Sequence, residues 1–204
     1  TTPLTTDGSL ILYTWNDEDG KKAFWHSTSH VMAQVLEQMY PGIKLTLGPA
    51  IANGFYYDVD FEEHKITEAD FKKIEDRVLE ISRGKHEFKL RPVSKADALE
   101  LYKDNVYKTE MITNLEDGTI TFCDHDTFTD LCRGGHIPNT GIIKAMKIMS
   151  VAGAYWRGDE KNKQLTRVYG ISFPKQKDLT DYLELLEEAK RRDHRKLGKE
   201  LELF

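Results

Sequence analysis

The order of helical and strand-like segments constrains the fold of this chain most strongly. A helix is expected at about residues 26–40, ending before Pro41-Gly42, and another from about residue 178. Two more are expected at 67–83 and 94–103, and each of these two begins with a capping box. Strand-like segments are expected at 54–61, 87–91, 119–124, 142–149 and 165–173. Because strands and helices do not alternate regularly, we expect an α+β fold, with a largely antiparallel sheet, flanking helices and a long C-terminal linker helix.

The two ends of the chain differ from its middle. Residues 10–15 read as a single strand followed by an acidic turn at 16–20, and they are expected to be the end of a preceding module. The residues 158–163 read as the tight link of a hairpin.

Composition describes an ordinary globular chain. Its 204 residues are 39% hydrophobic and 31% charged, enough for a sizeable core in one or two domains. No stretch approaches the roughly 18 apolar residues that span a bilayer, and no signal-like segment is present, so no membrane contact is expected. Two cysteines favour a reduced, cytoplasmic setting over a disulfide scaffold. The net charge of −5 argues against a general nucleic-acid-binding surface.

The first candidate functional residues are two histidines in the string His26-Ser-Thr-Ser-His30. At 100° per residue both lie on one helical face, away from the helix's main apolar stripe. This phasing argues against ordinary core histidines, although solvated side chains or a helix cap at His26 would give the same pattern. The string lacks the glutamate of a HExxH helix, which excludes that class of metalloprotease.

The second candidate is the string Asp130-Leu-Cys-Arg-Gly-Gly-His136. Its adjacent glycines predict a loop that exposes backbone N–H groups to a ligand. Arg133 beside Cys132 favours a thiolate, and Asp130 is placed to orient a histidine. With the helical histidines this gives three imidazoles and one thiol, a set that holds Zn²⁺ or activates water. The spacing does not choose between them.

Other features are weaker. Tyr56 and Tyr57 follow Gly48-Pro49 and suit either base stacking or sheet packing. Lys108 is an isolated cation. Six basic residues between 144 and 167 suit phosphate contacts, and the basic residues at 190–199 suit either RNA or the helix dipole.

Several strings resemble the bacterial threonyl-tRNA synthetase family, specifically its second N-terminal, editing domain. They are the two strings above, Gly48-Pro49 with Gly54-Phe-Tyr-Tyr-Asp58, Ala152-Gly-Ala-Tyr-Trp-Arg-Gly-Asp159 and Arg192-Asp-His-Arg-Lys-Leu-Gly-Lys199. The resemblance implies that residues 1–20 are a remnant of the preceding TGS domain, 21–175 the editing domain and 176–204 a linker helix toward the catalytic domain. The chain is then expected to be an excised part, without the ATP site or the anticodon-binding domain.

The resemblance also implies a site and a substrate. The substrate would be the acceptor end of tRNA(Thr) carrying serine, and the implied catalytic residues are His26, His30, Lys108, Asp130, Cys132 and His136. The residues expected to bind substrate are Tyr56, Tyr57, Arg133 and Gly134. Gly135 stands where the family most often has proline, which predicts a looser loop.

No cofactor is expected to be required. Zinc is an alternative, held by the quartet His26, His30, Cys132 and His136, as in the related alanyl editing domain. ATP and a catalytic zinc would belong to the core domain, through which the full-length parent is expected to form a homodimer.

Serine is smaller than threonine by one methyl group, a difference worth only about 1–3 kcal/mol to a binding pocket, so a second pocket that excludes the methyl group improves selectivity. The expected reaction is hydrolysis of the serine ester, with His26 or His136 orienting or deprotonating water. Lys108 and loop N–H groups would stabilise the oxyanion. The alternatives are a zinc-dependent deacylase using the same quartet, a tRNA acceptor-arm binding module without chemistry, and a purely structural domain.

Overall fold

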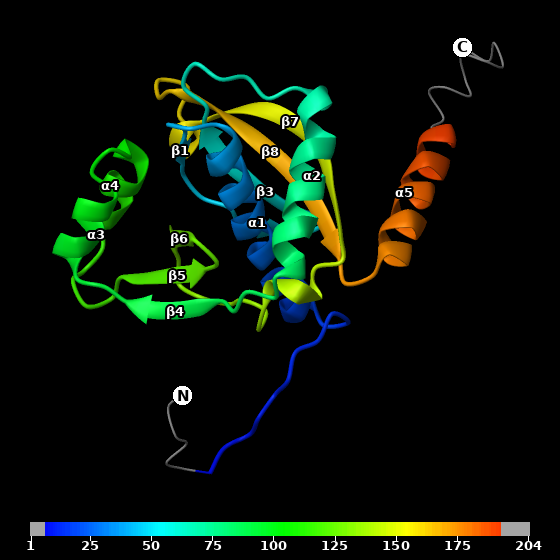
Figure 1. Cartoon of the computed structure of the whole chain (residues 1–204), viewed down its shortest axis with the longest axis horizontal. Coiled ribbons are helices and arrows are strands. Elements are labelled where there is room, and N and C mark those ends of the chain that lie inside the picture. Colours follow the sequence, from blue (N-terminus) through cyan, green and yellow to red (C-terminus); the bar gives the residue numbers. More distant parts are fainter. Residues whose placement is uncertain (1–6, 193–204) are drawn as a thin grey trace.

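A computed structural model describes residues 7–192, which form two antiparallel sheets and five α-helices (Figure 1). The larger sheet has the order β1-β3-β8-β7, and β2 also pairs with β3. Its strands are β1 (Lys44–Leu45), β2 (Ala50–Ile51), β3 (Gly54–Asp60), β7 (Ala145–Tyr155) and β8 (Gln164–Phe173). Every pairing in it is antiparallel, which confirms the expected α+β class.

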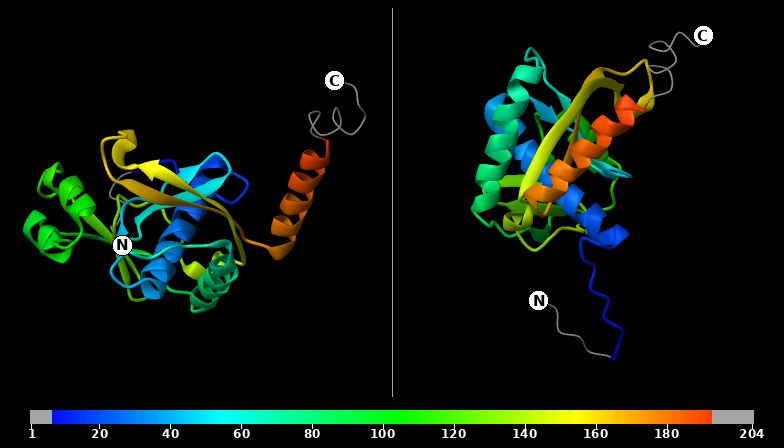
Figure 2. Two further views of the ribbon diagram at one scale, coloured as in Figure 1. Left: turned by 90° about the horizontal axis from the view of Figure 1, so that it is seen from above. Right: turned by 90° about the vertical axis from the view of Figure 1, so that its right-hand side faces the viewer.

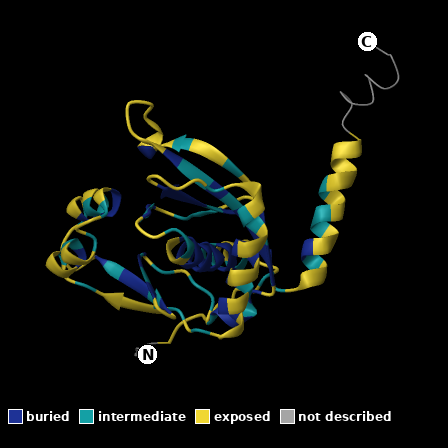
Figure 3. Cartoon of the chain, turned by 45° about the horizontal axis from the view of Figure 1, so that its top comes forward, coloured by how far each residue is buried: buried dark blue, intermediate teal, exposed yellow. Residues whose placement is uncertain are grey.

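Two helices cover the larger sheet. Helix α1 (Glu18–Met39) contacts β3 and β8, and α2 (Glu68–Arg83) contacts β7 and α1. The expected capping box of α2 is confirmed, since Thr67 and Asp70 form it, and the buried side chains of the helix include Ile74 and Val78. Figure 3 shows α1 as the most deeply buried helix, since it lies between the sheet and the rest of the molecule.

The smaller sheet consists of β4 (Lys89–Pro92), β5 (Thr121–His125) and β6 (Phe128–Leu131), in that order. Helices α3 (Lys95–Leu101) and α4 (Val106–Thr113) lie beside it at the left of Figure 1. A separate small core joins these elements and contains Ala98, Ile112, Ile120 and Phe122.

Helix α4 was not predicted. Asn105 caps it by accepting hydrogen bonds from the N–H groups of Tyr107 and Lys108. An asparagine before a short apolar run was the available signal, and the helix matters because it carries Lys108. The short strands β1, β2 and β6 were also missed.

Helix α1 begins eight residues earlier than expected, because the acidic segment read as a turn forms its first turn. Asp17 occupies the N-cap position, and Glu18 and Asp19 complement the positive end of the helix dipole. Gly20 fits inside the helix because any Cβ there would overlap the carbonyl of Thr14.

The strand expected at residues 10–15 is wrong: this segment is largely exposed and pairs with no strand within 7–192. At the other end, α5 (Gln176–Arg191) contacts β7 and β8 and otherwise projects from the molecule (Figure 2). Most of the basic segment 190–199 lies outside the described residues. Across 7–192, no helix is both long and apolar enough to cross a membrane.

Candidate functional site

Helix α1 contributes the first half of the site. His26 Nδ1 lies 3.2 Å from the carbonyl oxygen of Gly48, which can only accept, so Nδ1 carries the proton and Nε2 presents its lone pair. That Nε2 lies 3.4 Å from His30 Nε2 and 3.1 Å from the sulfur of Cys132. His26 is half-buried and His30 is only 3% exposed, so the two histidines face the interior between the sheets rather than solvent.

The hydroxyl residues between the histidines position the loops around them. Ser29 Oγ donates to the Gly48 carbonyl at 2.7 Å, and Ser27 Oγ accepts from the N–H of Ile137 at 3.0 Å. Gly48 has to be glycine here, since a Cβ would overlap the ring of Tyr57. The sequence predictions assigned no role to Ser27, Ser29 or Gly48, although hydroxyl residues inside a helix were a usable signal.

The loop after β6 contributes the second half. Cys132 is buried, and its sulfur lies 3.5 Å from His136 Nε2 and 3.4 Å from the N–H of Gly134. The ring of His136 stacks between His26 and Phe88, with centroid separations of 4.8 Å and 5.1 Å. The expected loop is therefore confirmed, but Cys132 is not exposed.

The backbone conformation of this loop accounts for its two adjacent glycines. Gly134 and Gly135 have φ angles of +101° and +84°, a left-handed backbone that favours glycine. Proline has φ near −65° and would not fit this backbone at position 135.

A buried ion pair lies beneath the histidines. Lys108 Nζ contacts Asp130 Oδ1, and these side chains are 1% and 3% exposed. The other oxygen, Oδ2, accepts from the hydroxyl of Tyr57 at 2.6 Å. His30 Nδ1 lies 2.9 Å from that oxygen, out of line for a regular hydrogen bond. Asp130 therefore faces a histidine, a lysine and a tyrosine together.

The imidazoles are neutral at pH 7. Burial lowers the pKa of His26 and lowers that of His30 well below its ordinary range, where the positive charge of Lys108 adds to the effect. Burial and the neighbouring histidines lower the pKa of His136 to about 2. Neutral imidazoles offer lone pairs for water or a metal.

Neither cysteine is an activated nucleophile. Burial raises the pKa of Cys132 and outweighs the Gly134 N–H and the Lys108 charge, both of which lower it. The expectation that the Arg133 side chain favours a thiolate is therefore wrong. Cys123 Sγ lies 3.6 Å from His136 Nδ1, and burial raises its pKa to about 12.

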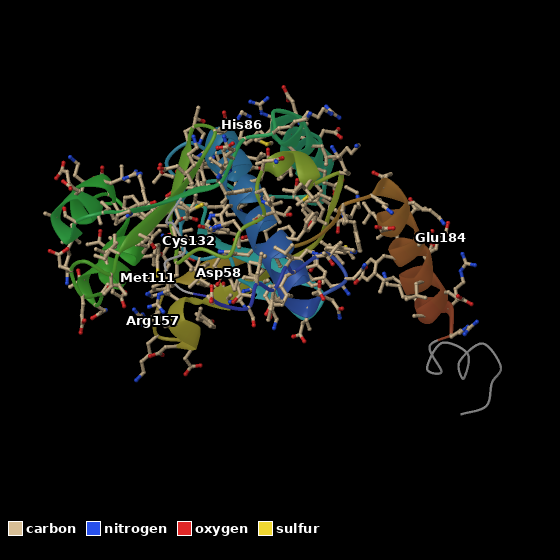
Figure 4. All side chains as sticks on the ribbon, turned by 90° about the horizontal axis from the view of Figure 1, so that it is seen from below. Asp58, His86, Met111, Cys132, Arg157 and Glu184 are labelled. Atoms are coloured by element: carbon tan, nitrogen blue, oxygen red, sulfur yellow. The ribbon has the colours of Figure 1, made fainter. Side chains whose placement is uncertain are left out.

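Four of the side chains described above line a cavity of about 690 Å³ between the two sheets. His26, His30, Asp130 and Cys132 form part of its wall, and Arg133 and Gly134 line it beside them. The opposite wall includes Met111 and Asn114 of the α4 region and Arg157 from the β7–β8 hairpin. Figure 4 shows Cys132, Met111 and Arg157 in the same region, with Glu184 far away on α5.

Four expected site residues do not line this cavity. His136 lines a separate cavity together with Gly135. Lys108 faces a separate cavity with Glu37 and Tyr102, because its ammonium group is turned toward Asp130 from behind. Tyr57 is fully buried and reaches the site only through its hydroxyl, so its ring offers no face to a base. Tyr56 lines a neighbouring cavity, under the guanidinium group of Arg167.

The quartet fits a metal ion by donor type and spacing. One ligand atom from each of His26, His30, Cys132 and His136 lies within 4.8 Å of the other three. Zinc bonds of 2.0–2.3 Å in a tetrahedron place donors about 3.4–3.6 Å apart. The three neighbouring pairs given above, at 3.1, 3.4 and 3.5 Å, are close to these values.

Comparison with known proteins relates the chain to enzymes of protein synthesis. Residues 119–169 match the family model described as the threonyl and alanyl tRNA synthetase second additional domain. The threonine–tRNA ligases of Flavobacterium johnsoniae and Flavobacterium psychrophilum are each 89% identical to it over 203 residues, covering 100% of this chain and 31% of each relative. That of Cytophaga hutchinsonii is 57% identical over 98% of the chain and 32% of the relative. The chain thus spans about a third of the length of these relatives.

Proposed function

Because this chain is homologous along its whole length to the N-terminal region of bacterial threonine–tRNA ligases, we propose that it edits aminoacyl-tRNA by hydrolysing the ester of serine wrongly attached to threonine tRNA. The observation that carries this proposal is a cluster of three neutral imidazoles and one thiol, of which His26, His30 and Cys132 line a cavity large enough for an aminoacylated terminal adenosine. The family match over 119–169 includes both Cys132 and His136 of this cluster.

His26 is the best placed group to handle water. Its Nδ1 proton is held by Gly48, so its Nε2 lone pair faces the cavity. Because burial lowers its pKa, the ring is in the basic form at pH 7. An aminoacyl ester is already activated, so a water molecule oriented by this nitrogen is sufficient for attack. The raised pKa of Cys132 favours a role in shaping the pocket over direct attack.

Asp130 and Lys108 support the histidines rather than handling the water themselves. Asp130 lines the cavity beside His30, whose Nε2 lies 3.4 Å from His26 Nε2, so its negative charge favours the positive charge that develops on His26 when that ring takes the proton of the water. Lys108 neutralises Asp130 and is a positioning residue, since its ammonium does not reach the cavity. The Gly134 N–H group donates to the Cys132 sulfur at 3.4 Å, so it would stabilise a developing oxyanion only by leaving that contact.

Serine deacylation by the whole chain tests the proposal. We expect release of serine from Ser-tRNA(Thr) at a rate well above that from Thr-tRNA(Thr), because the proposal requires a pocket that excludes the additional methyl group of threonine. His26→Ala should abolish this activity, whereas His64→Ala, an exposed histidine far along the chain, should retain it. Equal hydrolysis of both esters, or full activity of His26→Ala, would refute the proposed site.

A zinc-dependent deacylase is the second candidate function, and the donor types of the quartet, with three donor pairs at 3.1, 3.4 and 3.5 Å, favour it. His26, His30, Cys132 and His136 would hold the ion, which would supply Lewis acidity and a bound water of lowered pKa. Stoichiometric zinc in the purified chain, with activity lost to a chelator and restored by zinc, would select this mechanism over direct water activation.

A binding module without chemistry is the remaining alternative. It predicts that the chain binds the acceptor end of the tRNA but releases no serine from it. Under the editing proposal the setting is the cytoplasm, where charged tRNA is made. ATP use and dimer formation are then properties of the remaining part of the longer relatives.

A further inference from the structure

A second cavity adjoins the first and has no part in the chemistry described above. Its volume is about 290 Å³, and it shares three lining residues with the larger cavity: Leu47, Met111 and Arg157. Its own walls are aromatic and basic, with Tyr56, Tyr155, Trp156 and Arg167. The two cavities therefore adjoin at Leu47, Met111 and Arg157.

Planar groups are held in place along the second cavity. Asp58 accepts two hydrogen bonds from Arg167, at 2.7 Å and 2.8 Å, and so fixes the plane of its guanidinium group. The Arg167 Cζ atom lies 3.9 Å from the centroid of the Tyr56 ring. Its side chain keeps 27% exposure, so the guanidinium remains partly open toward the cavity. A flat base stacks readily on such a surface.

Arg157, which lines both cavities, has an unusual backbone conformation and a paired side chain. Its φ and ψ of 55° and 18° place a non-glycine residue in the left-handed region, which is unfavourable for a residue with a Cβ atom. Glu110 forms an ion pair with it, with Oε1 2.7 Å from Arg157 Nε, and accepts from the indole N–H of Trp156 at 2.9 Å. The guanidinium of Arg157 is half-exposed, and its terminal nitrogens would contact a phosphate while Nε stays paired with Glu110.

We propose that the second cavity binds the nucleotide that precedes the terminal adenosine of the tRNA, and that Arg157 contacts the phosphate joining the two. This inference rests on the proposed function, which places the aminoacylated adenosine in the first cavity. The chain of the RNA then has to pass the point where both cavities meet. A pyrimidine would stack on the guanidinium group of Arg167, and the phosphate would lie beside the positive charge of Arg157.

Two small ligands separate the subsites. Adenosine occupies only the first cavity, whereas the dinucleotide CpA carries the preceding cytidine and one phosphate. In ¹⁵N–¹H spectra of the full chain, the Trp156 indole N–H reports on the second cavity. The indole of Trp25 is buried against the Ser172 carbonyl and serves as an internal control.

We expect CpA to shift the Trp156 indole resonance, adenosine and CpA both to leave Trp25 unchanged, and CpA to bind roughly tenfold more tightly than adenosine. In Arg157→Gly, which also relieves the left-handed backbone, the ratio of the two affinities should fall toward one. Lys161→Ala removes the same charge from the same hairpin but lines neither cavity, so it should keep the ratio.

The outcomes distinguish this inference from the proposed function. If CpA binds no more tightly than adenosine, or if Arg157→Gly and Lys161→Ala reduce the ratio equally, the second subsite is refuted even where serine esters are hydrolysed. If the ratio depends on Arg157 but no serine is released, the subsite stands and the hydrolytic function fails.

Discussion

Replacing His125 by leucine should make folding less sensitive to acid. His125 ends strand β5 with only 2% exposure, and its ring lies between Phe88 and Phe128 at centroid distances of 4.9 Å and 5.4 Å. Within the described residues neither ring nitrogen has a hydrogen-bond partner. Burial, with the nearby His30, lowers its pKa to about 3.

The size of the effect follows from linkage between protonation and folding. In the unfolded chain a histidine has a pKa of about 6.5, so at pH 5 the unfolded state binds this proton and the folded state does not. Stability is therefore retained above about pH 6.5 and lost as the pH falls toward 3. For His125 alone the loss between pH 7.5 and pH 5 is about 2 kcal/mol.

Urea unfolding of both proteins at pH 7.5 and pH 5 measures this difference. The free energy of unfolding should fall less in His125→Leu, by about 2 kcal/mol, while His64→Leu at an exposed position provides the control. At pH 7.5 the variant should be at least as stable as the parent, because leucine has no polar atoms to bury. If the variant and the parent lose the same free energy on acidification, His125 is not a buried neutral histidine and this reasoning is wrong.

Three further predictions concern the site itself. Asp130→Asn should lower the free energy of unfolding by about 3–5 kcal/mol, because it leaves the buried Lys108 ammonium without its carboxylate. Adding Lys108→Met to this variant should restore part of the lost stability in the same urea assay. If the effects of the two substitutions on the free energy of unfolding simply add, the two residues are not a coupled pair. Gly48→Ala should slow serine deacylation about 100-fold, since the new Cβ displaces the carbonyl that orients His26; an unchanged rate, with folding checked by circular dichroism, would argue against that orientation. Cys132 should react with iodoacetamide at pH 8 more slowly than glutathione, because burial raises its pKa; a faster reaction, followed by mass spectrometry, would mean that the thiol is activated.

The sequence indicated the types of most elements because their signals are local. The capping box of Thr67 and Asp70 and the Ser94 cap lie within one helical turn, and the left-handed loop was visible as Gly134-Gly135. Local signals failed where a segment lacked a partner, as at residues 10–15, or where a short element depends on tertiary contacts, as with β1.

The sequence by itself also determined which side chains are candidates for the chemistry, since only a few are imidazoles or thiols. It did not determine their environment. The contact between His26 and Cys132 joins residues 106 positions apart, and it forms only because α1 packs where the loop after β6 passes. The same packing turns Lys108 behind Asp130, buries Tyr57 and keeps the histidines neutral. Burial and the proximity of charges are properties of distances through space, so only the tertiary structure decided how this set of residues can act.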